Sequence, residues 1–450
     1  MVGQSNSFIK YFGDSTLNNN GHSVVQLSSG NFLFAGYSDN TPLNYGLISL
    51  TKFDSEGNEL MNLYFGDSIH HFVAVRMVKD YNDQLVIAGA KLTANGIYQP
   101  YALKVDTNGN VIWQREYAAG LNSQFTGICL FSNNDIGFCG FETDTINGGL
   151  NFLATRIDGN GTIKFQVSIG DAVINEAAEN CISSGNNLMY ICGDKYIQPG
   201  IVNPYLVVID STGNFEWDLI VNNNLNSGSK SLIIDSNNDL LIVGEAATDS
   251  SQQFDITLAK IDIINRNLKW QRYLRGSNNS DAGFAIIESY NHNYLITGYG
   301  HDTITQTKRI IYLECDTSAN ELNKKYFGNS TINIGYYMTS SNNNGVLIAG
   351  TDLSNLKRVF IYEKNNSSFV GDMEQNANLI YPNPAFTQQQ ITSTHSYSEL
   401  MIIDPIGRLI FRDRGIHKNQ IHLPKLEAGW YILQLKDNDF FSRTKLLIEE

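Results

Sequence analysis

The sequence predicts an all-β protein: a seven-bladed β-propeller with four-stranded blades, its N-terminal strand closing the last blade, followed by a small C-terminal β-sandwich. Three observations predict this class. Two residue types recur with a period just above 50 residues, each period holds four short apolar runs separated by turns, and the incomplete first and last periods complement each other. Four-stranded units of this length, repeated four to eight times, are typical of propellers.

The period is carried by an aspartate and a glycine. An aspartate follows an apolar residue at steps of 52, and of 54 at the end, at Asp54, Asp106, Asp158, Asp210, Asp262 and Asp316. A glycine closes a short apolar run in seven places: Gly36, Gly89, Gly140, Gly193, Gly244, Gly298 and Gly350. Seven glycines therefore define seven units.

Each unit is predicted to contain four strands, as the fifth unit illustrates with "SLIIDS", "DLLIVGE", "ITLAKID" and "LKWQRYL". The third and fourth strands are joined by D-x-x-G-N or a variant, which suits a hairpin because Gly and Asn tolerate positive φ and Asp bonds back to the backbone. The third strand places a charged residue between apolar neighbours, which predicts one edge towards solvent. These charged residues are Lys52, Lys104, Arg156, Lys260 and Glu314.

Closure of the ring is predicted from the two ends of the repeat. "SFIKYFGDS" near the start matches a fourth strand without the three before it, and the seventh unit ends at "KRVFIYEK" without a fourth strand. We therefore expect Phe8–Phe12 to lie beside residues 358–364. An open array would leave two unpaired edges, which a ring removes.

Composition limits the function classes. Hydrophobic residues make up 42% and charged residues 17% of the 450 residues, and the net charge is −14. An acidic chain without basic runs disfavours nucleic acid as a partner, and no apolar stretch is long enough to predict a membrane span. The start, "MVGQSNSFIKYFGDS", shows no signal peptide.

Five cysteines are predicted to be small buried apolar residues, with a Cys181–Cys192 disulfide as the alternative. They form no CxxC pair, and the full set is Cys129, Cys139, Cys181, Cys192 and Cys315.

The repeat resembles the seven-bladed propeller units common in secreted bacterial proteins, over about residues 7–364. The resemblance rests on the D-x-x-G-N hairpin, the following "YFGD" and the strand-closing glycine. The sequence departs from it where Arg266 and Ala319 replace the hairpin glycine. The tryptophans of the fourth strand, expected to pack between blades, are Trp113, Trp217 and Trp270.

The chain is divided by these patterns into a propeller at 1–364, a polar linker at 365–378 and a β-sandwich at 379–450. The last segment resembles the type A C-terminal sorting domain of the type IX secretion system of Bacteroidota. Four motifs carry the resemblance in order: "YPNP", "DPIGRLI", "LPKLEAGWYILQL" and "TKLLIEE". Their motif residues are Tyr381, Pro382, Asn383, Pro384, Asp404, Gly407, Arg408, Gly429, Tyr431 and Lys445.

That resemblance implies that the segment is a sorting signal, which directs export of the protein. It implies the secretion machinery as a partner, and a secreted or outer-membrane surface location. Gly407 is expected in a tight turn that presents Arg408, and the C-terminal strand residues are expected to add to a receptor's sheet edge.

Ligand binding is predicted on one face of the propeller near its axis, because the long and varied loops all join strands on that face. These loops are rich in Asp, Asn, Thr and Tyr, which suit sugars, or Ca²⁺ as the one cofactor considered. The candidate residues are Asp14, His22, Asp67, His70, His71, Asp171, Asp281, His301 and Asp302. A structural role for the repeated "GD" aspartates is the alternative, and neighbours such as His70 and His71 point opposite ways on an extended chain, which argues against one metal.

Three functions stay open. The first is a non-catalytic module that binds a glycan or a protein. The second is an enzyme acting on polysaccharide through two carboxylates across the central funnel, although no nucleophile motif occurs. The third is a structural surface scaffold.

Overall fold

The computed structural model describes residues 7–40, 45–144, 148–171, 174–185, 187–198, 200–221, 226–247, 253–274, 280–302, 307–328, 331–363, 380–381, 385–386, 390–393, 397–404, 409–417, 420–437 and 440–449. The chain forms two compact units, Met1–Asn365 and Asn366–Glu450. The linker expected at 365–378 lies outside the described residues. None of the described residues forms a helix with the length and apolar character needed to span a membrane.

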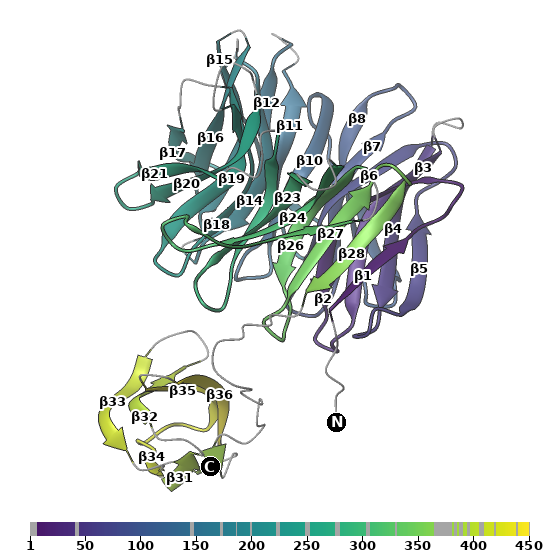
Figure 1. The fold of residues 1–450 in the computed structure, drawn as a ribbon. Helices are drawn as coiled ribbons and strands as arrows, with labels where there is room; N and C mark the ends of the chain where they lie inside the picture. Colours follow the sequence, from purple (N-terminus) through teal and green to yellow (C-terminus); the bar gives the residue numbers. More distant parts are fainter. Residues whose placement is uncertain are drawn as a thin grey trace. The chain divides into compact units, whose positions relative to one another are not determined.

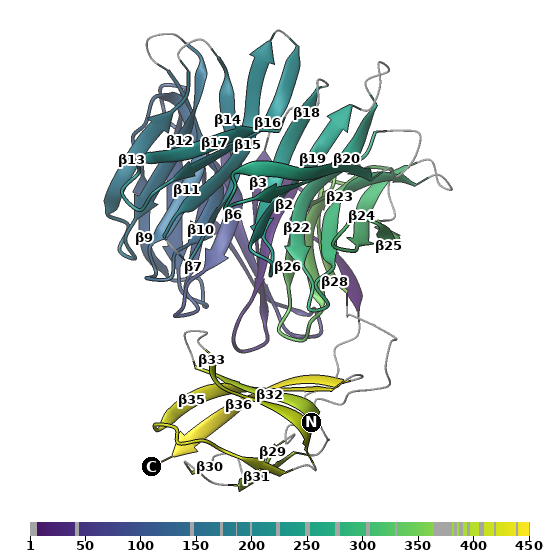
Figure 2. The ribbon, with the colours of Figure 1, turned by 90° about the vertical axis from the view of Figure 1, so that its left-hand side faces the viewer.

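The first unit is a β-propeller whose sheets are arranged around a common axis (Figures 1 and 2). It contains five separate four-stranded sheets and one eight-stranded sheet among the described residues. In the eight-stranded sheet, β2 to β5 and β6 to β9 form two consecutive four-stranded halves. Only the parallel pair Gly46 and His71 joins the halves in the described pairings.

The first strands of the sheets are β2 (Asn18–Gln26), β6 (His71–Lys79), β10 (Leu121–Leu130), β14 (Glu176–Ser183), β18 (Ser227–Ile234), β22 (Ala282–Glu288) and β26 (Asn333–Ser340). The second strands are β3 (Phe32–Asn40), β7 (Leu85–Leu92), β11 (Ile136–Thr143), β15 (Met189–Gln198), β19 (Asp239–Ala247), β23 (Tyr294–Asp302) and β27 (Val346–Asp352). The third strands are β4 (Tyr45–Phe53), β8 (Tyr98–Val105), β12 (Leu150–Ile157), β16 (Ile201–Ile209), β20 (Phe254–Asp262), β24 (Thr307–Cys315) and β28 (Lys357–Glu363). The outer strands are β5 (Glu59–Phe65), β9 (Val111–Glu116), β13 (Ile163–Ile169), β17 (Phe215–Ile220), β21 (Asn267–Leu274), β25 (Glu321–Phe327) and β1 (Phe8–Phe12).

The first strands form the inner wall of the propeller. Each contacts the first strand of the next four-stranded sheet or half-sheet, from β2 through β6, β10, β14, β18 and β22 to β26, and β26 contacts β2 again. This circle of contacts is closed, so the side chains that the first strands turn inwards meet around the axis.

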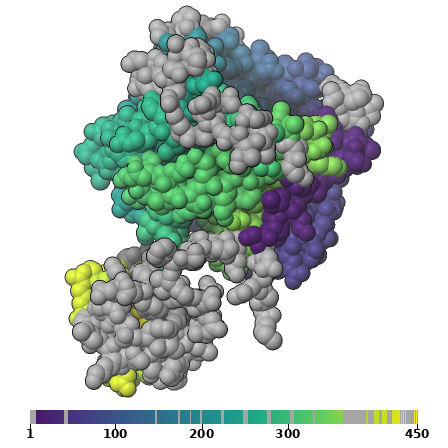
Figure 3. All heavy atoms as spheres, viewed as in Figure 1, coloured from purple at the N-terminus to yellow at the C-terminus, as the bar shows by residue number. Residues whose placement is uncertain are grey.

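The two ends of the propeller segment pair as the sequence predicts. Strand β1 is antiparallel to β28, with Phe8 opposite Tyr362 and Phe12 opposite Arg358. The space-filling view shows purple residues from the start of the chain packed against the green end of the propeller segment (Figure 3). The predicted closure by the N-terminal strand is therefore confirmed.

The recurring hairpin between third and outer strands is built by its aspartate. In the second hairpin, Asp106 Oδ1 accepts hydrogen bonds from the backbone nitrogens of Asn108 and Asn110 at 2.8 and 2.9 Å, and Oδ2 accepts one from the Asn110 side chain. Gly109 has a φ of +82°. Where the sequence departs from glycine, Arg266 and Ala319 adopt φ of +56° and +66°, so the turn keeps the left-handed conformation at some steric cost.

The predicted exposure of the third strands is wrong for three of the charged residues. Lys104, Arg156 and Lys260 are buried, because both faces of these strands are covered. Each pairs with an aspartate of the turn between the first two strands of its own sheet. The pairs are Lys104–Asp80 at 2.9 Å, Arg156–Asp135 at 2.9 Å and Lys260–Asp235 at 2.8 Å.

Aromatic and cysteine side chains fill the space between neighbouring sheets. Trp113 of β9 packs with Phe125 and Phe138 of the next sheet and donates to the carbonyl of Gly159 at 3.1 Å. All five cysteines are buried and free, so the Cys181–Cys192 disulfide considered from the sequence does not form.

One irregularity recurs in every first strand and explains the periodic glycines. Opposite each strand-closing glycine, the first strand carries a bulge of one residue. A Cβ on any of these glycines would lie 1.8 to 2.3 Å from a carbonyl oxygen of the first strand; for Gly89 that oxygen belongs to Val73, at 1.8 Å. Only glycine allows the bulged backbone to approach so closely.

The second unit contains two small sheets that share one apolar core. The strands are β29 (Ile380–Tyr381), β30 (Ala385–Phe386), β31 (Gln390–Ser393), β32 (Tyr397–Ile403), β33 (Leu409–His417), β34 (Gln420–His422), β35 (Gly429–Asp437) and β36 (Phe440–Glu449). One sheet has the order β29-β31-β34 and the other β30-β36-β35-β32-β33. Buried Ile391 and Ile421 of the smaller sheet belong to the same core as Leu400 and Leu433 of the larger one.

Candidate functional site

The bulge residues of the first strands make up the candidate site. A bulge turns one extra residue out of the regular pairing, and the first strands that carry these residues form a closed circle around the axis. We call the following set the axial ring: His22, Val75, Thr126, Glu179, Lys230, Phe284 and Tyr336.

One side of the axial ring is aromatic. His22 lies between two tyrosine rings, with centroids 4.9 Å from Tyr336 and 5.5 Å from Tyr37, and both pairs are stacked. Phe284 meets Tyr336 edge-on at 5.5 Å and Tyr299 at 6.0 Å. All five side chains stay half-buried. We call these five residues the aromatic arc.

The other side of the axial ring is charged. Lys230 Nζ lies 2.8 Å from Glu179 Oε1 and 3.9 Å from Asp194 Oδ2. Asp194 and Glu245 each follow the closing glycine of a second strand. We call Glu179, Asp194, Lys230 and Glu245 the charged cluster. It holds three carboxyl groups against one ammonium group.

Burial perturbs the titration of both halves. It raises the pKa of Asp194 to about 7, and Lys230 opposes this shift. The pKa of Glu245 is also raised by burial. Burial lowers the pKa of His22 to about 3, with a further contribution from Arg76. At neutral pH the aromatic arc is therefore uncharged, and Asp194 is poised to gain or lose a proton.

Two of the residues predicted from the sequence serve their own loops. Asp14 Oδ1 accepts hydrogen bonds from the Thr16 backbone at 2.8 Å and from its hydroxyl at 2.7 Å. Asp67 accepts from the backbone nitrogens of Ile69 and His70 at 2.9 and 2.7 Å. These contacts support the structural alternative for the repeated "GD" aspartates.

The adjacent histidines contact different partners, as expected on an extended chain. His70 Nδ1 lies 2.8 Å from Asp67, while the ring of His71 lies 6.3 Å from those of Tyr37 and Tyr98. His71 therefore extends the aromatic surface next to His22.

The remaining predicted residues lie outside the axial ring where the structure describes them. Asp171 is exposed. Asp281 is fully buried and accepts from the backbone nitrogen of His301 at 2.7 Å. The side chain of Asp302 lies outside the described residues. Of the predicted candidates, the structure brings His22 into the axial ring and His71 next to it.

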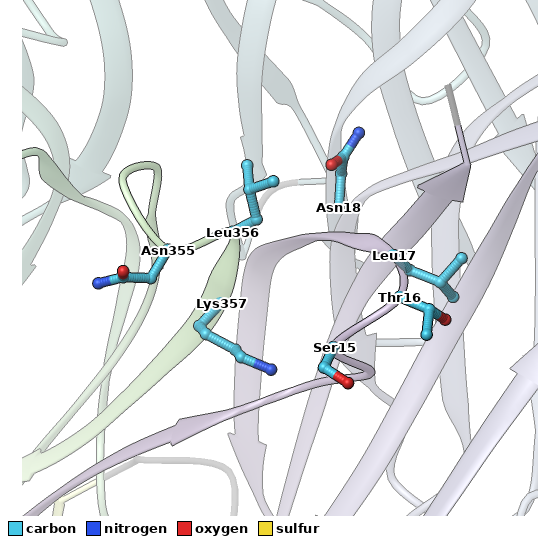
Figure 4. Close-up of a pocket in the computed structure, with 7 residues that line it drawn as sticks. All are labelled: Ser15, Thr16, Leu17, Asn18, Asn355, Leu356 and Lys357. Carbon is cyan, nitrogen blue, oxygen red and sulfur yellow. The ribbon is translucent and has the colours of Figure 1, made fainter. Parts of the chain in front are cut away.

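A pocket of about 450 Å³ is lined by residues 15–18 and 355–357, where the loop after β1 meets the turn between β27 and β28 (Figure 4). Its polar groups are used in joining the chain ends. Lys357 Nζ donates to the carbonyl of Gly13 at 3.0 Å, and Asn19 Nδ2 donates to the carbonyls of Asp14 and Leu356. This pocket belongs to the closure and contains no member of the axial ring.

Within the described residues, no group of three or more His, Cys, Asp and Glu side chains is arranged to hold a metal ion. Two carboxyl groups of the charged cluster, those of Glu179 and Asp194, lie within 4 Å of an ammonium group instead.

Sequence reasoning missed most of the axial ring, although a signal existed. Each bulge residue lies fourteen positions before a strand-closing glycine, and each second-strand residue such as Tyr37 or Asp194 directly follows one. Aligning the repeats on these glycines isolates both sets. Arg76, directly after the bulge of β6, was also missed.

The sorting-signal residues are only partly described. The backbone of Tyr381 lies in β29 and that of Lys445 in β36. Asp404 is buried, and Tyr431 donates to the carbonyl of Glu427 at 3.1 Å. Gly429 begins β35 with a φ of +153°. Pro382, Asn383, Pro384, Gly407 and Arg408 lie outside the described residues, so the turn expected at Gly407 stays a prediction.

A family model of the secretion system C-terminal sorting domain matches residues 379–449. The chain therefore carries a type IX secretion C-terminal sorting domain and is a secreted or cell-surface protein. Such a domain implies interaction with the secretion machinery. No curated protein matches the chain.

Solved structures share the propeller fold at low sequence identity. A catalytically inactive virginiamycin B lyase from Staphylococcus aureus with quinupristin is 10% identical, with a TM-score of 0.53 over 79% of this chain and 99% of that one. Sqt1 of Chaetomium thermophilum, bound to the N-terminus of a ribosomal protein, is 9% identical, with a TM-score of 0.50 over 78% of this chain and 98% of that one. At these identities the likeness shows the fold alone.

Proposed function

We propose that the chain is a non-catalytic glycan-binding propeller with seven blades, displayed at the cell surface or released through a C-terminal β-sandwich. The seven bulged first strands, each opposite its own closing glycine, support seven blades. On this reading the eight-stranded sheet is two blades joined by the single pair Gly46 and His71.

The aromatic arc carries the binding proposal. Aromatic side chains normally lose their exposed surface in a core, yet the five rings of the arc stay half-buried beside the axis. Stacked, partly exposed rings offer flat apolar faces, and the hydroxyls of Tyr37, Tyr299 and Tyr336 add polar edges. A sugar ring has the same combination of apolar faces and polar rim.

Polar groups around the arc suit a hydroxylated ligand as well. The neutral imidazole of His22 has one donor and one acceptor nitrogen. Concave sites with an apolar lining and a few convergent polar groups are typical of small-ligand binding.

A glycan array on the purified full-length chain, followed by calorimetry on any positive glycan, tests this proposal. Tyr336→Ala should weaken binding at least tenfold. Tyr81→Ala is the matched control, because Tyr81 is 68% exposed in the turn between β6 and β7, away from the aromatic arc. Binding that survives Tyr336→Ala and His22→Ala unchanged would contradict a site at the arc.

A polysaccharide-active enzyme is the second candidate, supported by the charged cluster. Glu179 and Asp194 lie on either side of Lys230, and the raised pKa of Asp194 suits a proton donor while Glu179 stays paired with the ammonium group. Release of reducing ends from a bound polysaccharide, abolished in Asp194→Asn, would favour this candidate over simple binding.

A further inference from the structure

Arg76 is a buried cation without a carboxylate partner. It directly follows the bulge of β6, is only 9% exposed, and forms no ion pair with any described residue. Its Nη1 donates to the backbone carbonyl of Tyr336 at 2.8 Å, while its Nε has no hydrogen-bond partner. Three other buried cations, Lys104, Arg156 and Lys260, are each paired with an aspartate at 2.8 to 2.9 Å.

The guanidinium group contacts a strand outside its own sheet. The carbonyl that it binds belongs to β26, and β2 lies between β6 and β26 in the circle of first strands. The guanidinium carbon also lies 5.4 Å from the ring centre of Tyr337. Its charge contributes to the lowered pKa of His22, and the charge of Glu179 acts on Arg76 in turn. The hydrogen bond to Tyr336 brings the guanidinium group to the backbone of the aromatic arc.

An unpaired guanidinium in such a place is costly, because burial lowers the pKa of Arg76 and disfavours its charged form. An incoming carboxylate would relieve that cost, since arginine presents paired N–H donors that match the two oxygens of a carboxylate. The carbonyl that the guanidinium group binds belongs to Tyr336, whose ring stacks on His22. A ligand that combined a sugar ring with a carboxylate would use both features at once.

We propose that Arg76 is the subsite for the carboxylate of an acidic saccharide, a glycan that contains uronic acid. This inference rests on the proposed glycan binding and names its ligand class. The chain's net charge of −14 disfavours general attraction of anions, so recognition depends on this local pairing.

The test is calorimetry on the full-length chain with oligosaccharides of galacturonate, glucuronate and mannuronate, each compared with its uncharged methyl ester. We expect at least one acid to bind tenfold or more tightly than its ester. Arg76→Gln should abolish that preference, and Arg76→Lys should restore part of it because it keeps the charge without the planar fork. The control is Arg115→Gln, which removes an exposed arginine of β9.

A merely structural role for Arg76 predicts a different pattern. Arg76→Gln would then lower the urea midpoint and weaken acid and ester equally, whereas the proposal predicts an unchanged or higher midpoint and a selective loss for the acid.

Equal binding of acid and ester in the unaltered protein would overturn this inference and leave the proposed glycan binding intact. Failure of all acids and esters, together with an empty glycan array, would overturn both. Tight binding of an aspartate-rich peptide that displaces the oligosaccharide would assign Arg76 to a protein ligand instead.

Discussion

Phe12 of the N-terminal strand lies opposite Arg358 of the last propeller strand, and the guanidinium carbon of Arg358 lies 5.7 Å from the ring centre of Phe12. The same ring meets Phe34 and Phe53 edge-on at 4.9 and 5.0 Å. This one side chain therefore joins the closing strand of the last sheet to β3 and β4 of the first sheet, a junction that we call the seam.

Phe12→Ala should destabilise the propeller by about 2–4 kcal/mol, because it removes these contacts and leaves a cavity at the seam. Ile9→Ala in the same strand should cost less than about 1 kcal/mol, since Ile9 is 40% exposed. Urea unfolding of both variants measures the difference. Equal effects would mean that the seam does not limit stability.

Gly89→Ala should cost about 3 kcal/mol or more, since the new Cβ would lie 1.8 Å from the Val73 carbonyl oxygen and the bulge would have to rearrange. Gly185→Ala serves as the control, because a Cβ added there would meet no atom within 4 Å and the φ of Gly185 is not positive. Thermal and urea unfolding should show near-native stability for the control only.

Lys104→Met should destabilise the protein by about 3–5 kcal/mol, since it leaves the carboxylate of Asp80 buried without its cation. Lys91→Met should cost less than about 1 kcal/mol, because its partner Glu116 is 47% exposed. Adding Asp80→Asn to Lys104→Met should recover much of the loss. A double variant no more stable than the single one would argue against a charge effect.

Stability should fall as the pH rises from about 4 to 7, through Asp194. Its pKa is raised from 3.8 to about 7 in the folded state, so in this window the folded chain binds more protons than the unfolded chain. Each unit of difference between the folded and unfolded pKa lowers the free energy of unfolding at pH 7 by about 1.4 kcal/mol. Asp194→Asn should remove this contribution, so that its advantage over the unaltered protein grows up to pH 7 and then stays constant. A difference that does not vary with pH would show that Asp194 ionises normally.

Removal of the last ten residues should leave the propeller folded but prevent the protein from crossing the outer membrane, so that it stays on the periplasmic side. Those residues contain most of β36, which pairs with β35 and β30 in the sorting unit. Lys425→Ala, at an exposed position of the same unit, should be displayed normally. Protease accessibility on intact cells distinguishes the two variants. Normal surface display of the truncated chain would refute the role of the C-terminal residues as a sorting signal.

Periodicity and hairpin chemistry were sufficient to predict the strand order and the closing strand, because both depend on local turns and on which edges lack a partner. Burial of Lys104, Arg156 and Lys260 was not predictable from a single strand, since their aspartate partners come from a different turn of the sheet. Asp14 and Asp67 were candidate ligand residues because they are polar and repeated, and both accept hydrogen bonds from the backbone of their own loops.

At the bulges, the backbone conformation does not depend on which side chain is present. The closing glycine and the backbone hold each bulge in place, so the fold constrains the identity of the bulge side chain little. The seven equivalent positions are occupied by histidine, valine, threonine, glutamate, lysine, phenylalanine and tyrosine. Exchanging these seven residues should therefore change what the protein recognises while leaving the scaffold intact, which makes the propeller suitable for redesigning specificity one blade at a time.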